Sequence, residues 1–245
     1  MIVVGTRAHG ERRRRALSSF GVDFHKSEWM EAGDDPALSP TIFLVEQPPN
    51  CSVPTHFHRQ NQFQLFVHGG GSVGPQALQP VTVHYAGAYT GYGPLVSGPE
   101  GIHYFTIRPV CESGAIPIEE AREKMVRGPK RHMQAGPVDC ASSDVLSALR
   151  EAQVEDVIPA AEDGLGARVH RLPPGGRLDA TVPSATAGTF VVVLSGTLLH
   201  GNIELGQWES LFVTSDEAFP DLRAGRQGGQ AILLFMPPKA IEYSQ

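Results

Sequence analysis

The stretch NCSVPTHFHRQNQFQLFVHG, residues 50–69, decides the fold of this chain. Its first half carries His56-Phe57-His58, and alternate side chains of a strand share one face, so the two imidazoles point the same way. Two imidazoles placed like this can chelate a single divalent ion. Its second half, residues 62–68, alternates polar and apolar side chains before Gly69-Gly70-Gly71, which predicts a strand followed by a turn.

Short runs rich in strand-forming residues continue on both sides of this stretch, and clusters of Gly or Pro separate them. The chain holds 27 Gly and 20 Pro, which agrees with many tight turns between short strands. A spacing of about ten residues between runs is typical of a β-sandwich or β-barrel, so we expect an all-β fold. The predicted strands are 41–46, 62–68, 81–85, 103–108, 167–172, 189–194, 209–213 and 230–236.

Residues 117–127 and 143–150 have the residue pattern of helices, and the basic stretch 127–137 between them predicts a linker. The strands after this connection repeat the order of those before it. Ile107-Arg108-Pro109 corresponds to Phe235-Met236-Pro237, and the two sets are offset by about 127 residues. Two copies of one β-barrel are the simplest explanation.

Two segments carry a family resemblance. After His56 and His58, Gln62 follows at the fourth position and Gly69 after six more residues. Further on, Gly93 is followed by Pro99, Gly101 and His103. These segments resemble the two sequence motifs of the cupin superfamily. Gln62 stands at the glutamate position of the first motif, and the second motif is one residue short before His103.

The resemblance covers most of residues 40–110, and with the repeat it implies a bicupin of two tandem double-stranded β-helix barrels. We expect an N-terminal barrel over 1–115, a helical connection over 116–152 and a degenerate C-terminal barrel over 153–245. No metal ligand is expected in the second barrel, because the corresponding side chains are unsuited to one. They are Pro183, Ala185, Thr189 and Ala231.

The resemblance also implies the site residues. His56, His58 and His103 are the expected metal ligands if His103 faces inward. Gln62 is a weak oxygen ligand, or it orients the substrate or a ligand histidine from behind the ligands. Tyr104 is a candidate for positioning the substrate. Imidazoles accept several metals, so Fe(II) is favoured from the family and Ni, Mn, Zn or Cu remain open. A site without a carboxylate keeps the full charge of the ion and favours an anionic substrate. An empty polar pocket is the alternative.

Two functional hypotheses follow from the motifs. The first is a metal-dependent cupin enzyme, an Fe(II) dioxygenase acting on a small chelating acid of aromatic or dicarbonyl type. The second is a non-catalytic cupin that binds a small ligand or regulates another protein. A metal-dependent isomerase or lyase is a further reading, because the fold does not determine the reaction.

Other polar residues near the motifs receive a structural interpretation. His68 and His84 are expected at strand or rim positions, and His84 could border the pocket. Arg59 and Arg108 are candidates for pairing with a substrate carboxylate, although a surface role is the favoured interpretation for both.

The composition excludes some classes of partner. The formal charge of −6 and a pI near 5.9 argue against a nucleic-acid groove. The basic run Arg12–Arg15 is expected to lie on a solvated arm or helix face. Cys51, Cys111 and Cys140 have no metal-binding or disulfide spacing, so they predict reduced thiols in a cytoplasmic protein. No membrane span is expected, and the family resemblance suggests a homodimer.

Overall fold

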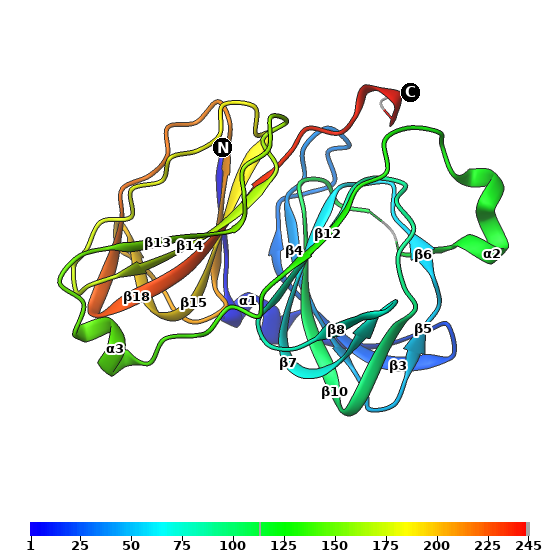
Figure 1. Cartoon of the computed structure of the whole chain (residues 1–245), viewed down its shortest axis with the longest axis horizontal. Helices are drawn as coiled ribbons and strands as arrows, with labels where there is room; N and C mark the ends of the chain where they lie inside the picture. The colour runs from blue at the N-terminus through cyan, green and yellow to red at the C-terminus, as the bar shows by residue number, and fades with distance from the viewer. Residues whose placement is uncertain (113, 244–245) are drawn as a thin grey trace. The chain divides into compact units, whose positions relative to one another are not determined.

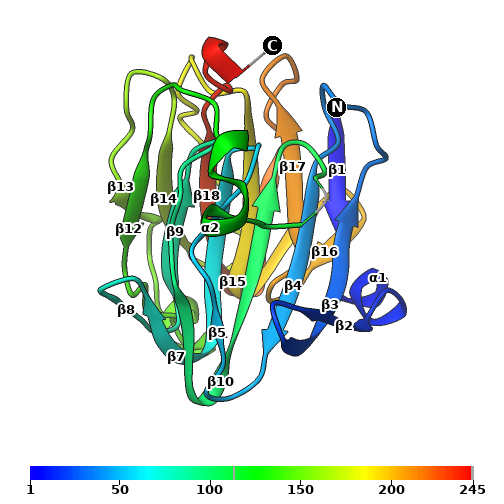
Figure 2. The ribbon, with the colours of Figure 1, turned by 90° about the vertical axis from the view of Figure 1, so that its right-hand side faces the viewer.

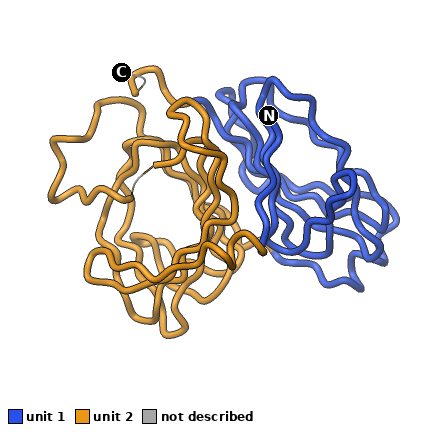
Figure 3. The backbone as a smooth tube through the Cα atoms, turned by 180° about the vertical axis from the view of Figure 1, so that it is seen from behind, with its two compact units in different colours: residues 1–7, 139–238 blue, residues 8–138, 239–245 orange. Residues whose placement is uncertain are grey.

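The computed structural model describes residues 1–112 and 114–243. The chain forms two compact units, shown in different colours in Figure 3. One unit comprises residues 8–138 and 239–245, and we call it the N-terminal barrel. The other comprises residues 1–7 and 139–238, and we call it the C-terminal barrel.

The N-terminal barrel is built from strands joined by tight turns (Figure 1). Its strands are β2 (Arg15–Ser19), β3 (Val22–Glu31), β4 (Thr41–Gln47), β5 (Ser52–Val53), β6 (His56–Phe57), β7 (Gln62–Val73), β8 (Gln76–Leu78), β9 (Thr82–Ala86), β10 (Leu95–Arg108), β11 (Ile116–Pro117) and β12 (His132–Ala135). Its helical elements are α2 (Ile118–Ala121) and the 3₁₀ turns η1 (Arg122–Lys124) and η2 (Ile241–Tyr243), while α1 (Arg7–Arg12) begins at the boundary between the units.

Within the described residues, the main sheet of this barrel has the order β12-β9-β7-β10-β4-β3-β2, with β5 and β8 at its margins. Strands β7 and β10 pair in antiparallel fashion at its centre, and β4 lies on the other side of β10, as Figure 2 also shows. The register of β10 against β7 shifts between His103 and Tyr104. The shift skips Val67 on β7, and consecutive residues of β10 keep alternating between its two faces.

The C-terminal barrel repeats the plan with a second sheet, whose order among the described residues is β1-β17-β15-β18-β14-β13 with β16 beside β15. Its central pair, β15 and β18, corresponds to β7 and β10. The elements are β1 (Ile2–Gly5), α3 (Ser143–Ser147), β13 (Gln153–Ile158), β14 (Gly166–Leu172), β15 (Gly188–His200), β16 (Ile203–Leu205), β17 (Ser210–Thr214) and β18 (Leu222–Met236).

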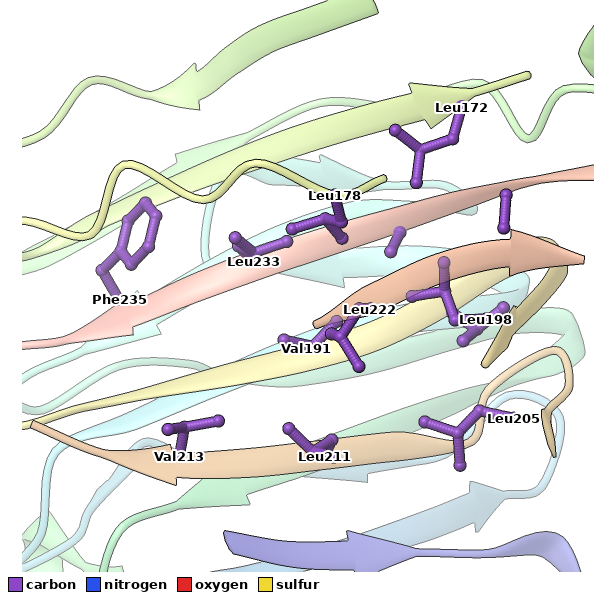
Figure 4. Packing of buried hydrophobic residues seen from close by; sticks show 13 residues of the cluster. Leu172, Leu178, Val191, Leu198, Leu205, Leu211, Val213, Leu222, Leu233 and Phe235 are labelled. Atoms are coloured by element: carbon purple, nitrogen blue, oxygen red, sulfur yellow. The ribbon is translucent and has the colours of Figure 1, made fainter. Parts of the chain in front are cut away.

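The interior of the C-terminal barrel is filled by aliphatic side chains from facing strands (Figure 4). Val191, Leu211 and Leu233 are fully buried there, and Phe235 closes one end of the cluster. Each such side chain contributes about 1.5–3 kcal/mol to stability by leaving water. This apolar cluster fills part of the barrel, and a cavity of about 280 Å³ beside it is lined in part by Thr186, Thr189 and Thr214.

The structure corrects several local expectations. Residues 132–135 of the predicted linker form β12, which pairs with β9. The predicted helices are shorter, since α2 continues only as a 3₁₀ turn and α3 ends at Ser147. Gly69–Gly71 does not end its strand, because β7 continues to Val73. At Gly71 a Cβ would collide with the backbone oxygen of Val96, so glycine there permits a close approach of β10.

The borders between the units also differ from those expected over 1–115, 116–152 and 153–245. Residues 1–7 belong to the C-terminal barrel because β1 pairs with β17. Residues 116–138 belong to the N-terminal barrel because β11 pairs with β6 and β12 with β9. Pairing between distant strands, which local composition does not reveal, determines both borders.

The basic run of the N-terminus is engaged in ion pairs. Arg13, Arg14 and Arg15 pair with Glu31, Glu46 and Glu28 on β3 and β4. The three cysteines are free thiols, as expected. None of the helices in residues 1–112 and 114–243 is long and apolar enough to cross a membrane.

Candidate functional site

A cavity of about 300 Å³ opens into the N-terminal barrel. Its volume is near the lower end of the range of roughly 300–1,000 Å³ that is usual for small-ligand sites. One part of its wall is apolar and aromatic, formed by Leu17, Phe20, Val22, Phe24, Phe43, Val45 and Val53. The polar part of the wall comprises Lys26, Gln47, His56, His58, Gln64, Tyr92, Tyr104, Thr106, Arg108 and Glu112.

His56 and His58 lie side by side in the polar wall, and their ring centroids are 5.2 Å apart. His56 is fixed by two backbone hydrogen bonds to Tyr92, and β6 ends directly before His58. Nδ1 of His56 lies 2.8 Å from the backbone oxygen of Pro54, and Nδ1 of His58 lies 3.1 Å from that of Gly114. A carbonyl only accepts, so each Nδ1 carries the proton and each Nε2 is an acceptor, which in His58 faces Nη2 of Arg108 at 3.3 Å.

Burial keeps both imidazoles neutral. Desolvation lowers the pKa of His56 to about 4, with a smaller contribution from the Arg108 charge. The pKa of His58 is also well below its ordinary value, because of burial first and of Arg108 second. The two rings can accept hydrogen bonds or ligate a metal, but they supply no positive charge at neutral pH.

Two cationic side chains line this cavity: Lys26, which pairs with Glu28 over 2.8 Å, and Arg108, which is almost fully buried. Its Nε donates to Oε1 of Gln62 over 3.0 Å, and Nε2 of Gln62 donates to Oη of Tyr92 over 2.6 Å. Its Nη2 lies 3.0 Å from Nδ1 and 3.3 Å from Nε2 of His58. Gln62 and His58 thus hold the guanidinium against the wall of the cavity.

Glu112 is the acidic residue nearest to the guanidinium. Its Oε2 lies 4.0 Å from Nη1 of Arg108 and has no hydrogen-bond partner among the described residues. Burial raises the pKa of Glu112, although the Arg108 charge opposes the shift. The Arg108 charge is therefore balanced at a distance, without a direct carboxylate contact.

The inward-facing side chains of β10 are Tyr104, Thr106 and Arg108, since all three line the cavity. His103 points to the opposite face of the strand, where its ring centroid lies 4.6 Å from that of His68 and the two rings are tilted by 41°. The bulge beside His103 brings these two residues opposite each other. His103 is absent from the cavity wall and does not join His56 and His58.

The donor set of the cavity does not fit the metal site expected from the motifs. Of the four expected ligands, His56 and His58 are together, His103 is on the other face, and both polar atoms of Gln62 are engaged. In residues 1–112 and 114–243, no three His, Cys, Asp or Glu side chains are grouped in a way that could hold a metal ion. The neighbouring guanidinium also repels a divalent cation.

A second group of polar residues crosses the interior beside the cavity. Thr106, Gln64, His84 and Gln134 are successive partners across β10, β7, β9 and β12. Nδ1 of His84 donates to Oε1 of Gln64 over 2.9 Å, and Nε2 of His84 accepts from Nε2 of His132 over 2.6 Å. Burial lowers the pKa of His84 to about 3. His84 is thus a buried member of a network and not a rim residue.

Sequence reasoning favoured a surface role for Arg108, and the structure contradicts that interpretation. A usable signal exists in the alternation along the strand, because Tyr104, Thr106 and Arg108 share one face. His103 falls on the other face by the same alternation. Gln62 is absent from the cavity wall and fully buried, and its side chain contacts Arg108 and Tyr92 instead of a ligand histidine. Tyr104 does line the cavity, and burial raises its pKa.

Comparison with known proteins identifies the fold. No family model matches the chain, and no curated sequence is similar to it. Among solved structures, a candidate dioxygenase from Nostoc punctiforme has a TM-score of 0.55 at 12% identity, over 99% of this chain and 80% of that one. The bacterial pirin YhhW from Escherichia coli, in complex with nickel(II), has a TM-score of 0.55 at 15% identity, over 97% and 100%.

A mutant of oxalate decarboxylase from Bacillus subtilis has a TM-score of 0.54 at 8% identity, over 94% of this chain and 77% of that one. Such matches span both barrels and belong to cupin-fold proteins. The chain has the bicupin fold. At these identities the likeness concerns the fold alone, so the function of this bicupin has to be argued from its own cavity.

Proposed function

We propose that the N-terminal barrel of this bicupin binds a small aromatic acid, whose carboxylate pairs with Arg108. The buried guanidinium in the cavity wall is the observation that carries the proposal. Of its five N–H groups, the contacts to Oε1 of Gln62, Nε2 of His58 and the backbone oxygen of Glu112 occupy three. Two remain for a ligand, and a planar carboxylate matches two parallel donors of a guanidinium.

The aromatic wall supports the second half of the proposal. The rings of Phe20, Phe24 and Phe43 line the cavity. The ring of Phe20 is stacked on that of His56, with centroids 6.5 Å apart. Phe43 has Nζ of Lys26 3.8 Å from its centroid and Cζ of Arg108 at 5.5 Å. A flat apolar ligand can stack on such a wall while its charged end meets Arg108.

A metal-dependent enzyme, in its narrower form an Fe(II) dioxygenase, is the second candidate function. It is favoured by the carbonyls beside Nδ1 of His56 and of His58, which leave both Nε2 atoms as acceptors. It ranks second because the third expected ligand, His103, is on the other face of β10. A metal-dependent isomerase or lyase would need the same three histidine ligands, so the position of His103 argues against it equally.

Isothermal titration of chelator-treated protein tests the proposal. Benzoate and benzyl alcohol have the same ring and differ in charge, so we expect benzoate to bind at least about tenfold more tightly. Arg108→Met is expected to remove this preference, and Arg108→Lys, which keeps the charge, should retain part of it. Equal binding of the two probes by the wild type would contradict the proposal.

Arg59→Met is the matched control, since the exposed side chain of Arg59 is not part of the cavity wall. It removes the same charge and should leave the benzoate preference intact. The homodimer suggested by the family resemblance stays a prediction, which light scattering of the purified chain checks.

A further inference from the structure

The cavity of the N-terminal barrel has a buried positive charge next to two histidines that could hold a metal ion. His56 and His58 present their Nε2 lone pairs from the wall of the cavity, as metal-binding histidines do. Gln62 occupies the position that carries a carboxylate in the motif it resembles. His56, His58 and Gln62 therefore form part of an arrangement suited to a metal ion, and we call these three residues the metal-binding frame. It remains to be asked which cation this frame surrounds in the present barrel.

Arg108 makes contact with both parts of this frame. Its Nε donates to Oε1 of Gln62, and its Nη2 lies 3.3 Å from Nε2 of His58. A metal bound to that Nε2 would sit about 2 Å away from it. The ion would then lie within about 5 Å of a permanent guanidinium charge in a buried site, where repulsion between two cations is strong.

We propose that the guanidinium of Arg108 replaces the metal ion of this barrel, so that a side chain and not a bound ion supplies the cation for the ligand. This inference deepens the proposed function and rests on it for the identity of the ligand. The amide of Gln62 suits this arrangement, because it orients Arg108 without neutralising it. A glutamate in its place would form a closed ion pair with the guanidinium.

The rest of the wall agrees with this replacement. On β10 the residue beside Gln62 is Arg108, since Ile107 pairs with Phe63. Oε2 of Glu112 lies 3.8 Å from Nδ1 of His58, on the side of the ring that faces the Gly114 carbonyl. That carboxylate is thus beside the protonated nitrogen of His58, whereas the Nε2 lone pair of the same ring faces Arg108.

Equilibrium dialysis against Zn²⁺ and Ni²⁺, with metal measured by elemental analysis, tests the replacement. We expect the wild type to bind less than about a tenth of an ion per chain at micromolar metal. The double variant Gln62→Glu/Arg108→His removes the guanidinium and adds a carboxylate and an imidazole beside His56 and His58. It should bind close to one ion per chain, and His56→Ala added to it should abolish that binding.

Arg108→Met provides a second test that needs no new ligand. Removing the guanidinium should raise the affinity for Zn²⁺ at least tenfold over the wild type, because His56 and His58 lose their cationic neighbour. Circular dichroism shows whether each variant is folded, and the conclusion then rests on the folded ones. Near-stoichiometric metal in the wild type, lost in His56→Ala/His58→Ala, would overturn the inference. Unchanged Zn²⁺ affinity in folded Arg108→Met would also overturn it.

The benzoate titration separates this inference from the proposed function. If the wild type binds neither metal nor benzoate, the replacement of the metal by Arg108 still stands, but the proposal of an aromatic acid as ligand is contradicted. A wild type that binds benzoate only after stoichiometric loading with metal overturns the inference and leaves a small acid as the ligand.

Discussion

Nε of Arg108 and Oε1 of Gln62 lie 3.0 Å apart on neighbouring strands in the interior of the N-terminal barrel. In the C-terminal barrel the strand pairing places Thr189 opposite Phe235 at the equivalent positions, one residue away from the sequence alignment, which matches Arg108 with Met236. Phe235 packs into the aliphatic core there, whereas Arg108 lines a cavity. Thr189 also lines a cavity, of about 280 Å³, so the buried guanidinium is what distinguishes the pair in the N-terminal barrel.

Gln62→Glu should weaken benzoate binding at least about tenfold, because a carboxylate 3 Å from the guanidinium would satisfy it internally and repel the ligand. Gln76→Glu is the control. It adds the same charge at an exposed position of β8 that is not part of the cavity wall. Titration calorimetry at pH 7.5 measures both. A larger loss in the control variant than in Gln62→Glu would contradict this account.

Glu112→Gln should have the opposite effect. It removes a carboxylate whose Oε2 is 4.0 Å from Arg108 and which makes no hydrogen bond through that atom with the described residues. We expect the benzoate affinity to rise at least about threefold, since the guanidinium loses its nearest competing anion. The same titration, with Glu119→Gln on the surface helix α2 as control, decides whether the carboxylate competes with the ligand.

The bicupin fold could be predicted from the sequence, because the spacing between a few residues of the motif is characteristic of it. His56, His58, Gln62 and Gly69 occur at the distances of one motif, and the strands around them repeat. The site could be predicted only in part. His56 and His58 lie on the wall as expected, since a short local stretch places both.

The features of the site that could not be predicted depend on pairing between strands that are far apart in the sequence. The contact of Arg108 with Gln62 depends on the register of β10 against β7, which a bulge shifts near His103. The position of His103 in the second motif favoured it as a metal ligand. The alternation of side chains along β10 instead places it on the outer face of the strand. The amino-acid composition of residues 127–137 is typical of a linker. Part of this stretch is nevertheless a strand, because it pairs with β9.

His103→Ala tests that correction directly. The side chain lies beside His68 on the face of β10 opposite the cavity. We therefore expect benzoate affinity to stay within about twofold of the wild type, whereas Tyr104→Ala, one residue along and on the cavity wall, should reduce it. Calorimetry on the two variants compares neighbouring positions of one strand, and a loss at His103 alone would contradict the assignment of faces.

Gly71→Ala should destabilise the N-terminal barrel by at least about 2 kcal/mol, because its Cβ would collide with the backbone oxygen of Val96. Gly70→Ala is the matched control, since a Cβ there meets only the backbone oxygen of Leu78 at 3.4 Å. Urea unfolding followed by circular dichroism gives both free energies. Equal losses at the two positions would show that β7 and β10 approach less closely at Gly71.

The buried histidines predict the pH dependence of stability. The pKa of His56 is about 4 and that of His84 about 3 in the folded barrel, against 6.5 for an ordinary histidine. Between these values the unfolded chain binds more protons than the folded one, so the free energy of unfolding falls as the pH decreases. The loss begins near pH 6.5 and amounts to about 3 kcal/mol for His56 alone by pH 4.

Urea unfolding between pH 4 and pH 8, followed by the fluorescence of Trp29 in a Trp208→Phe background, measures this loss in the N-terminal barrel. His56→Gln should reduce the slope of the free energy of unfolding against pH below 6.5, because it removes one group that must charge on unfolding. Ile107→Val, a change at a fully buried position, should lower the stability by about 1 kcal/mol and leave the slope unchanged. The same slope in all three proteins would mean that other groups cause the acid sensitivity.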